Sequence, residues 1–148
     1  MKNSYLFSIL ILASILGCSQ SETKHVNMQE DITETTNFAR TGTKERMSGA
    51  YLNYTNTLNI ADTLLSVSSP VAESIEIHES YSTEDGLSGM RALDEISLKP
   101  NETLEMQAGG IHMMLINLKQ NLTTHDSVQI QLELKHAGTI TRTLPVRN

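Results

Sequence analysis

The sequence predicts one all-β domain, folded as a Greek-key sandwich or barrel, behind an N-terminal export segment. Apolar and polar residues alternate over most of the chain after about residue 44, a pattern typical of half-buried strands. Turn residues recur about every ten residues, and no window shows the 3.6-residue period of an amphipathic helix. A chain of 148 residues is long enough for one domain and too short for two well-packed cores.

Seven or eight short strands are expected along this domain. The segments that we expect to form them are 48–56, 63–69, 73–80, 90–98, 103–107, 108–118, 127–136 and 139–146. The clearest is SVQIQLELKH, because every second residue from Val128 to Leu134 is apolar and the residues between them are polar. Pro70 ends the second segment, and Gly86 and Gly89 lie in the loop before the fourth.

Residues 1–17 are predicted to be a lipoprotein signal peptide. Lys2 supplies a positive charge, and the apolar stretch 5–16 has signal-peptide length and is too short to span a bilayer well. The stretch ends in ILGC, which resembles the lipobox of bacterial lipoproteins, so we expect Cys18 to be lipidated and to begin the mature chain. The alternative is an ordinary signal peptide followed by a chance cysteine.

Residues 18–43 are predicted to be the lipidated cysteine and a flexible tether, and residues 44–148 the folded domain. The tether is rich in Ser, Thr, Glu, Gln and Asn, so it cannot bury enough apolar surface to order itself. His25 and Met28 lie in it and are expected to be solvated. Because Cys18 is the only cysteine, its lipidation leaves the mature protein without a thiol or a disulfide.

Charge and composition exclude several classes of function. A net charge of −6 and a pI near 5.3 argue against nucleic-acid binding, which needs a basic face. No Ser-His-Asp order and no paired carboxylates stand out in the sequence, so we expect no enzymatic activity. The export signal and lipobox predict a bacterial periplasmic protein anchored to a membrane, and Ser19 after the cysteine favours the outer membrane.

The segment AGGIHMMLINL, residues 108–118, is predicted to be a buried strand with a histidine at its centre. Residues two apart in a strand share a face, so His112 and Met114 lie opposite Met113 and Leu115. The second pair belongs to an adequate core face, which leaves His112 and Met114 on an outer or rim face. Taken alone, this pair is also explained as packing, because methionine commonly fills gaps.

Two further residues complete a pattern of metal donors. His78 ends the strand SIEIH, and Met90, twelve positions later, follows the Gly-rich loop. His112 comes twenty-two positions after Met90, and Met114 two positions after that. This spacing resembles the signature of the PCu(A)C family of periplasmic copper chaperones, and all four required positions match.

The resemblance covers about residues 45–146 and includes the segments AYLNYTN, EDGLSGMR and LKPNETLEMQAGGIHMMLINLK in family order. It implies a cupredoxin-like domain that binds Cu(I). The ligands that it implies are His78, Met90, His112 and Met114. In one departure from the family pattern, Glu79 occupies the optional methionine position after the first histidine.

The chemistry of these donors agrees with copper. Two imidazoles and two thioethers are neutral and soft to borderline, which suits Cu(I) over Zn(II), Mg(II) or Ca(II). A blue-copper electron-transfer centre needs a cysteine thiolate, and the sole cysteine stands at the predicted anchor. Of the remaining donors, His125 and His136 are expected to be solvated, and Met47 and Met106 to be packing residues.

The leading hypothesis is therefore a lipid-anchored Cu(I) chaperone that passes copper to a protein acceptor. The resemblance implies that this acceptor is a copper-binding subunit of cytochrome c oxidase, or its thiol-bearing assembly factor. One alternative is a periplasmic protein that sequesters copper for tolerance. Another is a metal-free β-sandwich that acts as an interaction module in the cell envelope.

Overall fold

The structure is a computed structural model that describes residues 36–148, and its secondary structure consists of eleven β-strands. The strands are β1 (Phe38–Arg40), β2 (Ser48–Tyr51), β3 (Asn53–Thr55), β4 (Asp62–Ser68), β5 (Ala72–Ser82), β6 (Ser88–Leu93), β7 (Ile96–Leu98), β8 (Thr103–Glu105), β9 (Ile111–Leu118), β10 (Ser127–Leu134) and β11 (Gly138–Arg147). Within this part of the chain, no helix is long and apolar enough to cross a membrane. The signal peptide, Cys18, His25 and Met28 lie outside the described residues.

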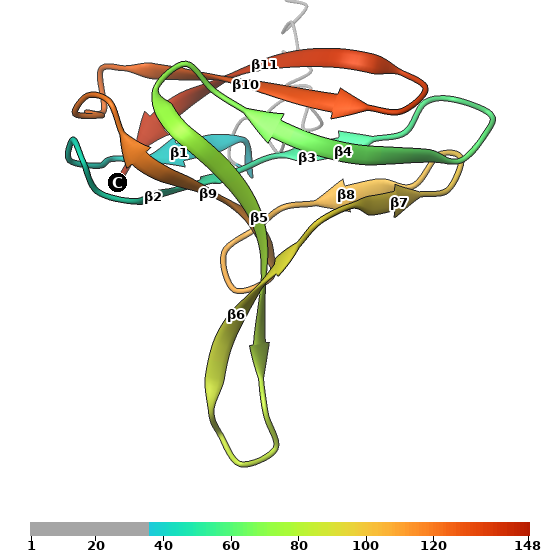
Figure 1. The fold of residues 1–148 in the computed structure, drawn as a ribbon, viewed down its shortest axis with the longest axis horizontal. Helices are drawn as coiled ribbons and strands as arrows, with labels where there is room; N and C mark the ends of the chain where they lie inside the picture. The colour runs from blue at the N-terminus through green and yellow to red at the C-terminus, as the bar shows by residue number, and fades with distance from the viewer. Residues whose placement is uncertain (1–35) are drawn as a thin grey trace, which may run out of the picture.

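Nine of the strands form one strongly bent sheet in the order β6-β5-β9-β2-β1-β11-β10-β4-β7, and β3 pairs with β8 (Figure 1). The short strand β1 joins the two halves of the sheet, because it pairs in parallel with β11 and antiparallel with β2. The sheet thereby folds over on itself around a single core. The predicted all-β sandwich or barrel is confirmed.

The core consists of the inward faces of the two halves. On β10, the four apolar residues from Val128 to Leu134 are at most 2% exposed, and the alternate positions are exposed, as predicted. From the other half, β9 contributes Met113 and Leu115, both fully buried. Burial of a side chain of this size stabilises the fold by about 1.5–3 kcal/mol.

The folded part of the chain begins earlier than the predicted boundary at Lys44. Strand β1 lies inside the stretch that its composition assigns to the tether, and its central residue, Ala39, is fully buried. A strand of three residues is too short to show a period of its own. Strand β1 is held by backbone hydrogen bonds to β11 on one edge and to β2 on the other, and the composition of the segment does not reveal this pairing.

Two segments that the sequence predicts as single strands are each divided. Residues 48–56 form β2 and β3, which belong to different sheets, because the chain leaves the first ladder at Leu52. Residues 90–98 fall partly in β6 and partly in β7, and these two strands stand at opposite ends of the nine-stranded sheet. At the first break, alternation in sequence continues through Ala50, Leu52 and Tyr54, so it gives no sign that the strand changes its partner.

Asp62, at the start of β4, ties that strand to the turn between β10 and β11. Its carboxylate is 1% exposed and accepts backbone N–H bonds from Thr63 and His136 at 2.8 Å and from Ala137 at 2.9 Å. Burial alone would raise the pKa of Asp62, but these three bonds outweigh it and hold the pKa below its ordinary value. The charged carboxylate therefore stabilises this end of the fold.

The outer half of β5 and all of β6 leave the body of the domain and project as a two-stranded hairpin (Figure 1). We call residues 76–95 the hairpin arm. The loop at its tip is closed by backbone bonds from Thr83 N–H to the Leu87 carbonyl, 2.7 Å, and from Gly86 N–H to the Thr83 carbonyl, 2.9 Å. Gly86 has a φ of 80°, a conformation that other residues rarely adopt.

Candidate metal centre

The two faces of strand β9 carry different residues, core residues on one and metal donors on the other. Met113 and Leu115 are fully buried in the core, and His112 and Met114 lie on the opposite face, as their spacing predicts. This face is less open than expected, however. His112 is only 8% exposed and Met114 is half-buried, because neighbouring strands and loops partly cover them.

The register of β5 and β6 brings the other two donors to the same face. His78 on β5 stands directly opposite His112 on β9, and directly opposed residues share a face. Met90 on β6 stands opposite Ser80, which lies two residues beyond His78 and so also faces the same way. All four donors, including Met114 on β9, therefore lie on one face of the three-stranded segment β6-β5-β9.

The two imidazoles are close enough to share one ion. Their ring centroids are 6.1 Å apart and the ring planes are inclined by 68°. A metal–nitrogen bond is about 2 Å long, and the ring centre lies about 1 Å beyond the nitrogen. The centres of two rings that share an ion are therefore at most about 6 Å apart. The observed separation lies at that limit, so only a small side-chain adjustment is needed.

His112 keeps one ring nitrogen free for a ligand. Its Nδ1 lies 3.0 Å from the carbonyl oxygen of Gly110. A carbonyl can only accept, so the assigned tautomer carries the proton on Nδ1 and donates it to Gly110. The lone pair on Nε2 is then available, and the hydrogen bond fixes the ring orientation in the way that is common for histidine ligands.

His78 has the complementary arrangement. Its Nε2 lies 2.8 Å from Oε2 of Glu76, a carboxylate that can only accept, so Nε2 carries the proton. The other nitrogen, Nδ1, is buried and has no hydrogen-bond partner among the described residues. A buried polar atom without a partner is unfavourable by about 1–3 kcal/mol, and a bound metal ion would remove that penalty.

Met114 lies beside the aromatic ring of Tyr51. It stands opposite Gly49 on β2, and the phenol oxygen of Tyr51 would be 3.0 Å from a Cβ at Gly49. The ring of Tyr51 therefore lies over the glycine, in space that a side chain would occupy. Arg40 donates to the phenol oxygen from Nε at 3.3 Å and holds the ring in this position.

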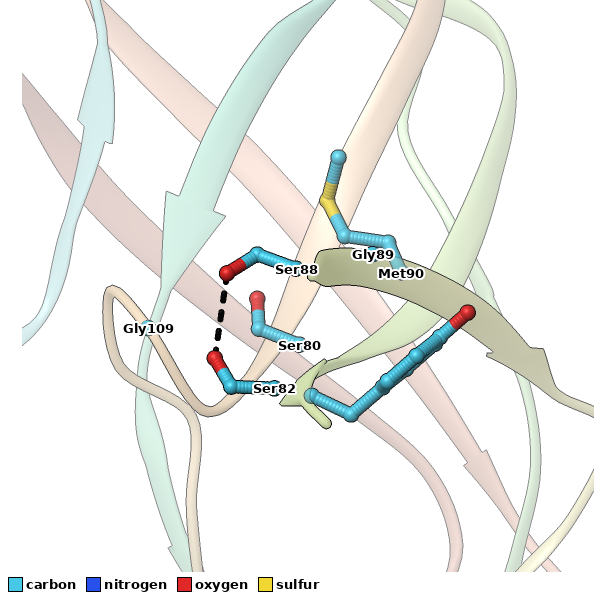
Figure 2. A pocket seen from close by; sticks show the side chains of 7 residues that line it. Ser80, Ser82, Ser88, Gly89, Met90 and Gly109 are labelled. Carbon is cyan, nitrogen blue, oxygen red and sulfur yellow. Dashed lines mark hydrogen bonds between the residues drawn. The ribbon is translucent and has the colours of Figure 1, made fainter. Parts of the chain in front are cut away.

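Met90 is the accessible member of the set, with 54% of its surface exposed. It lines an open pocket of about 430 Å³ on the hairpin arm, shown in Figure 2. The pocket also carries three serine hydroxyls, of which Ser82 and Ser88 form a hydrogen bond of 3.1 Å across the hairpin. Gly109, from the loop before β9, closes the remaining side.

The other predicted donors lie elsewhere. His125 and His136 are exposed, as expected, and Met106 is fully buried in the core, as expected. Met47 is 64% exposed, so its assignment as a packing residue is wrong. Glu79, at the optional methionine position, faces away from His78 and pairs with Arg91, whose Nε donates to Oε2 at 2.8 Å.

Sequence reasoning missed the groups that hold the two histidines. Glu76 was detectable, because in SIEIH it stands two positions before His78 and so shares its face. The Gly110 carbonyl was not detectable, because no local pattern shows where a loop carbonyl points. Across residues 36–148, no group of three or more His, Cys, Asp or Glu could hold a metal ion. The cluster described above differs because half of its donors are thioethers.

A family model for LpqE-like lipoproteins matches residues 25–146. No curated protein sequence matches the chain. Among solved structures, the apo PCuAC domain of PmoF2 is 22% identical, with a TM-score of 0.61, over 74% of this chain and 84% of that domain. The copper-bound form of the same PmoF2 domain has the same identity and TM-score, over 86% of its length.

A third solved structure is that of Cu(I)-bound DR1885 from Deinococcus radiodurans. It is 25% identical, with a TM-score of 0.56, over 74% of this chain and 75% of that one. These likenesses confirm the cupredoxin-like, all-β fold class that the sequence predicts.

Proposed function

This chain belongs to the LpqE-like lipoprotein family, and we propose that it is a copper chaperone that binds one Cu(I) ion as its cargo. The proposed ligands are His78, Met90, His112 and Met114. The observation that carries the proposal is the gathering of these four donors on one sheet face, where each imidazole keeps one nitrogen free of partners among residues 36–148. The protein would carry copper without catalysing a reaction.

The donor set selects the metal. Neutral imidazoles and thioethers suit Cu(I), and they offer nothing to hard cations, which prefer oxygen ligands. Thioethers bind without losing a proton and do not form disulfides, so they keep their function in an oxidising compartment. The similar PmoF2 domain and DR1885 both have copper-bound structures, which supports the choice of metal.

The place of action follows from the N-terminal segment. We propose that residues 1–17 are removed on export and that Cys18 is lipidated, which would anchor the protein in the periplasm, by preference at the outer membrane. The residues between Cys18 and β1 would then serve as the tether. About 20 flexible residues span on the order of 25 Å r.m.s., so the domain would work close to its membrane.

Delivery to an acceptor is the proposed outcome of binding, with the copper centres of cytochrome c oxidase as the acceptor that the PCu(A)C resemblance implies. Growth of a strain that lacks the gene tests this point. A delivery protein matters when copper is scarce, so oxidase activity should fall in copper-poor medium and recover when copper is added. Harm seen only in excess copper would instead identify a sequestering protein.

Copper binding itself is tested by anaerobic Cu(I) titration of the full chain against a competing chelator, with X-ray absorption to identify the neighbouring atoms. We expect one copper per chain, with two sulfur and two nitrogen neighbours or a three-coordinate subset of them. Met47→Leu is the matched control for Met90→Leu, because both methionines are exposed and only Met90 lies at the cluster. Absence of sulfur neighbours would refute the proposed site.

A further inference from the structure

The hairpin arm ends in a free sheet edge. Strand β6 is the outermost strand of the nine-stranded sheet and pairs only with β5 among the described residues. An edge strand presents unpaired N–H and C=O groups to which another chain can add a strand. Met90, the most exposed of the proposed ligands, lies in this strand.

The hydrogen-bond pattern shows which groups of β6 are free. Ser80 donates its N–H to the carbonyl oxygen of Gly110, 3.1 Å away, on the side of β9. Pairs in an antiparallel ladder alternate between residues that exchange both bonds and residues that exchange none. Because the Ser80 N–H is used on the β9 side, Ser80 and Met90 exchange no backbone hydrogen bonds. The N–H and C=O groups of Met90 therefore point outward, away from β5. The backbone N–H and C=O groups of Ser88 and Ala92, two positions away on either side, also point outward.

This geometry determines where a partner's side chain would lie. A strand added to β6 would bond to the backbone of Met90 itself, and its residue opposite Met90 would be about 5.5 Å away between Cα atoms. That residue would also share a face with Met90, and so with the copper site. By contrast, His112 is 8% exposed and offers no comparable approach.

The charge of the arm indicates the kind of partner. Residues 76–95 contain six carboxylates and one cation, Arg91, which makes a net charge of −5 out of −6 for the whole chain. A second copy of this chain would bring the same charge to the same edge and be repelled. A partner with a basic contact face would be attracted and would associate faster.

The arm also offers apolar contact area beside this edge. Leu87 at the tip is 69% exposed and Tyr81 is 45% exposed. The ring of Tyr81 packs against Gly89 of β6, where an added Cβ would meet the ring at 2.7 Å. Exposed apolar side chains of this kind are typical of contact surfaces between proteins.

We propose that the copper acceptor is a protein with a basic contact face that adds a β-strand to β6 and places a cysteine opposite Met90. This inference rests on the proposed function. In the transfer step, the acceptor thiol loses its proton to solvent, and its sulfur bonds to Cu(I) as the bond from the Met90 sulfur breaks. The remaining ligands follow, and copper keeps its oxidation state throughout.

The docking half of the proposal is tested without copper. The probe is a short reduced peptide with a central cysteine between alternating lysine and valine residues, and its control replaces each lysine by glutamate. When the lysine peptide is added to the full chain, amide exchange measured by NMR should slow at Ser88, Met90 and Ala92. The glutamate peptide should bind at least about tenfold more weakly at low salt. Equal binding of both peptides, or no protection at these amides, would overturn the proposal.

The transfer half uses the copper-loaded chain. N-methylation of alternate backbone nitrogens in the lysine peptide removes its ladder bonds and keeps its thiol and charge, and we expect transfer about tenfold slower or more. Ala92→Pro should act in the same way, because it removes an outward N–H, with copper affinity unchanged within about twofold. An unchanged rate for the N-methylated peptide would refute edge docking. Loss of copper binding by the unmodified chain would instead refute the proposed function, which the titration detects separately.

Discussion

The half of the domain built from β4, β10 and β11 and the hairpin arm are made from the same kind of antiparallel pairing, yet they differ in what supports them. In the first half, β10 alternates strictly between buried and exposed residues, and Asp62 ties β4 to the turn between β10 and β11. The arm is paired on one side at β6 and exposes Tyr81, Leu87 and Met90. The two regions therefore have different roles, because the first half stabilises the fold and the arm presents the most accessible proposed ligand.

The candidate metal centre lies between these two extremes. Its β9 donors rest on a strand whose other face is core, and its β6 donor stands on the free edge. A rigid side and an exposed side are what a carrier needs, because it must hold its cargo and also release it to a partner. Four predictions test this division.

The largest effect is expected in the core. Leu132→Ala should lower the free energy of unfolding by about 2–5 kcal/mol, because it leaves a cavity at a fully buried position. Leu87→Ala, at the tip of the arm, should change it by less than about 0.5 kcal/mol. Chemical denaturation of both variants measures the difference. Similar losses would mean that the arm is part of the cooperative core.

Asp62→Asn should have the next largest effect, a loss of about 1–3 kcal/mol at neutral pH, because an amide replaces a charged acceptor of three backbone N–H bonds. The pKa of Asp62 is lowered in the folded state, so the charged carboxylate stabilises fully above its ordinary pKa, about 3.9. This contribution should disappear as the pH falls through the lowered folded-state value. Denaturation midpoints of both proteins between neutral and strongly acidic pH should converge on acidification.

The third prediction concerns the donor face alone. Met114→Leu keeps volume and apolarity but removes the sulfur, so Cu(I) affinity should fall about tenfold or more, equivalent to about 1.4 kcal/mol. The free energy of unfolding should change by less than about 1.5 kcal/mol. Met113→Leu is the matched control on the core face and should leave copper affinity unchanged. If Met114→Leu instead unfolds the domain and keeps copper binding, this methionine is a packing residue.

The smallest effect is expected at Glu76, which orients His78 without touching the metal. Glu76→Gln keeps an oxygen acceptor for Nε2, so Cu(I) affinity should fall only a few-fold, whereas Glu76→Ala should lower it by about tenfold. Nitrogen NMR of the His78 ring gives an independent measurement, because the proton should leave Nε2 in part of the Glu76→Ala population. An unchanged ring spectrum in Glu76→Ala would show that Glu76 does not set the tautomer.

Periodicity in the sequence was sufficient for the all-β class and for the two faces of β9, whereas the resemblance supplied the four donors, whose role as ligands stays a prediction. The first two are local properties, since alternation along a strand decides which residues share a face before any partner strand is known. The same local rule would also have identified Glu76. It could not distinguish Met47 from Met106, because burial of an isolated methionine depends on what packs over it.

Only the tertiary structure decided the register that sets His78 opposite His112, because pairing between strands depends on contacts distant in sequence. It also decided that β1 joins the fold and that residues 90–98 divide between opposite ends of the sheet. The acceptors of the two ring N–H groups are local, because the Glu76 carboxylate and the Gly110 carbonyl each lie two residues from their histidine, but only the structure shows which ring nitrogen each one engages. The sequence contains the donors, but which of them meet is determined by the pairing of strands that are distant in sequence.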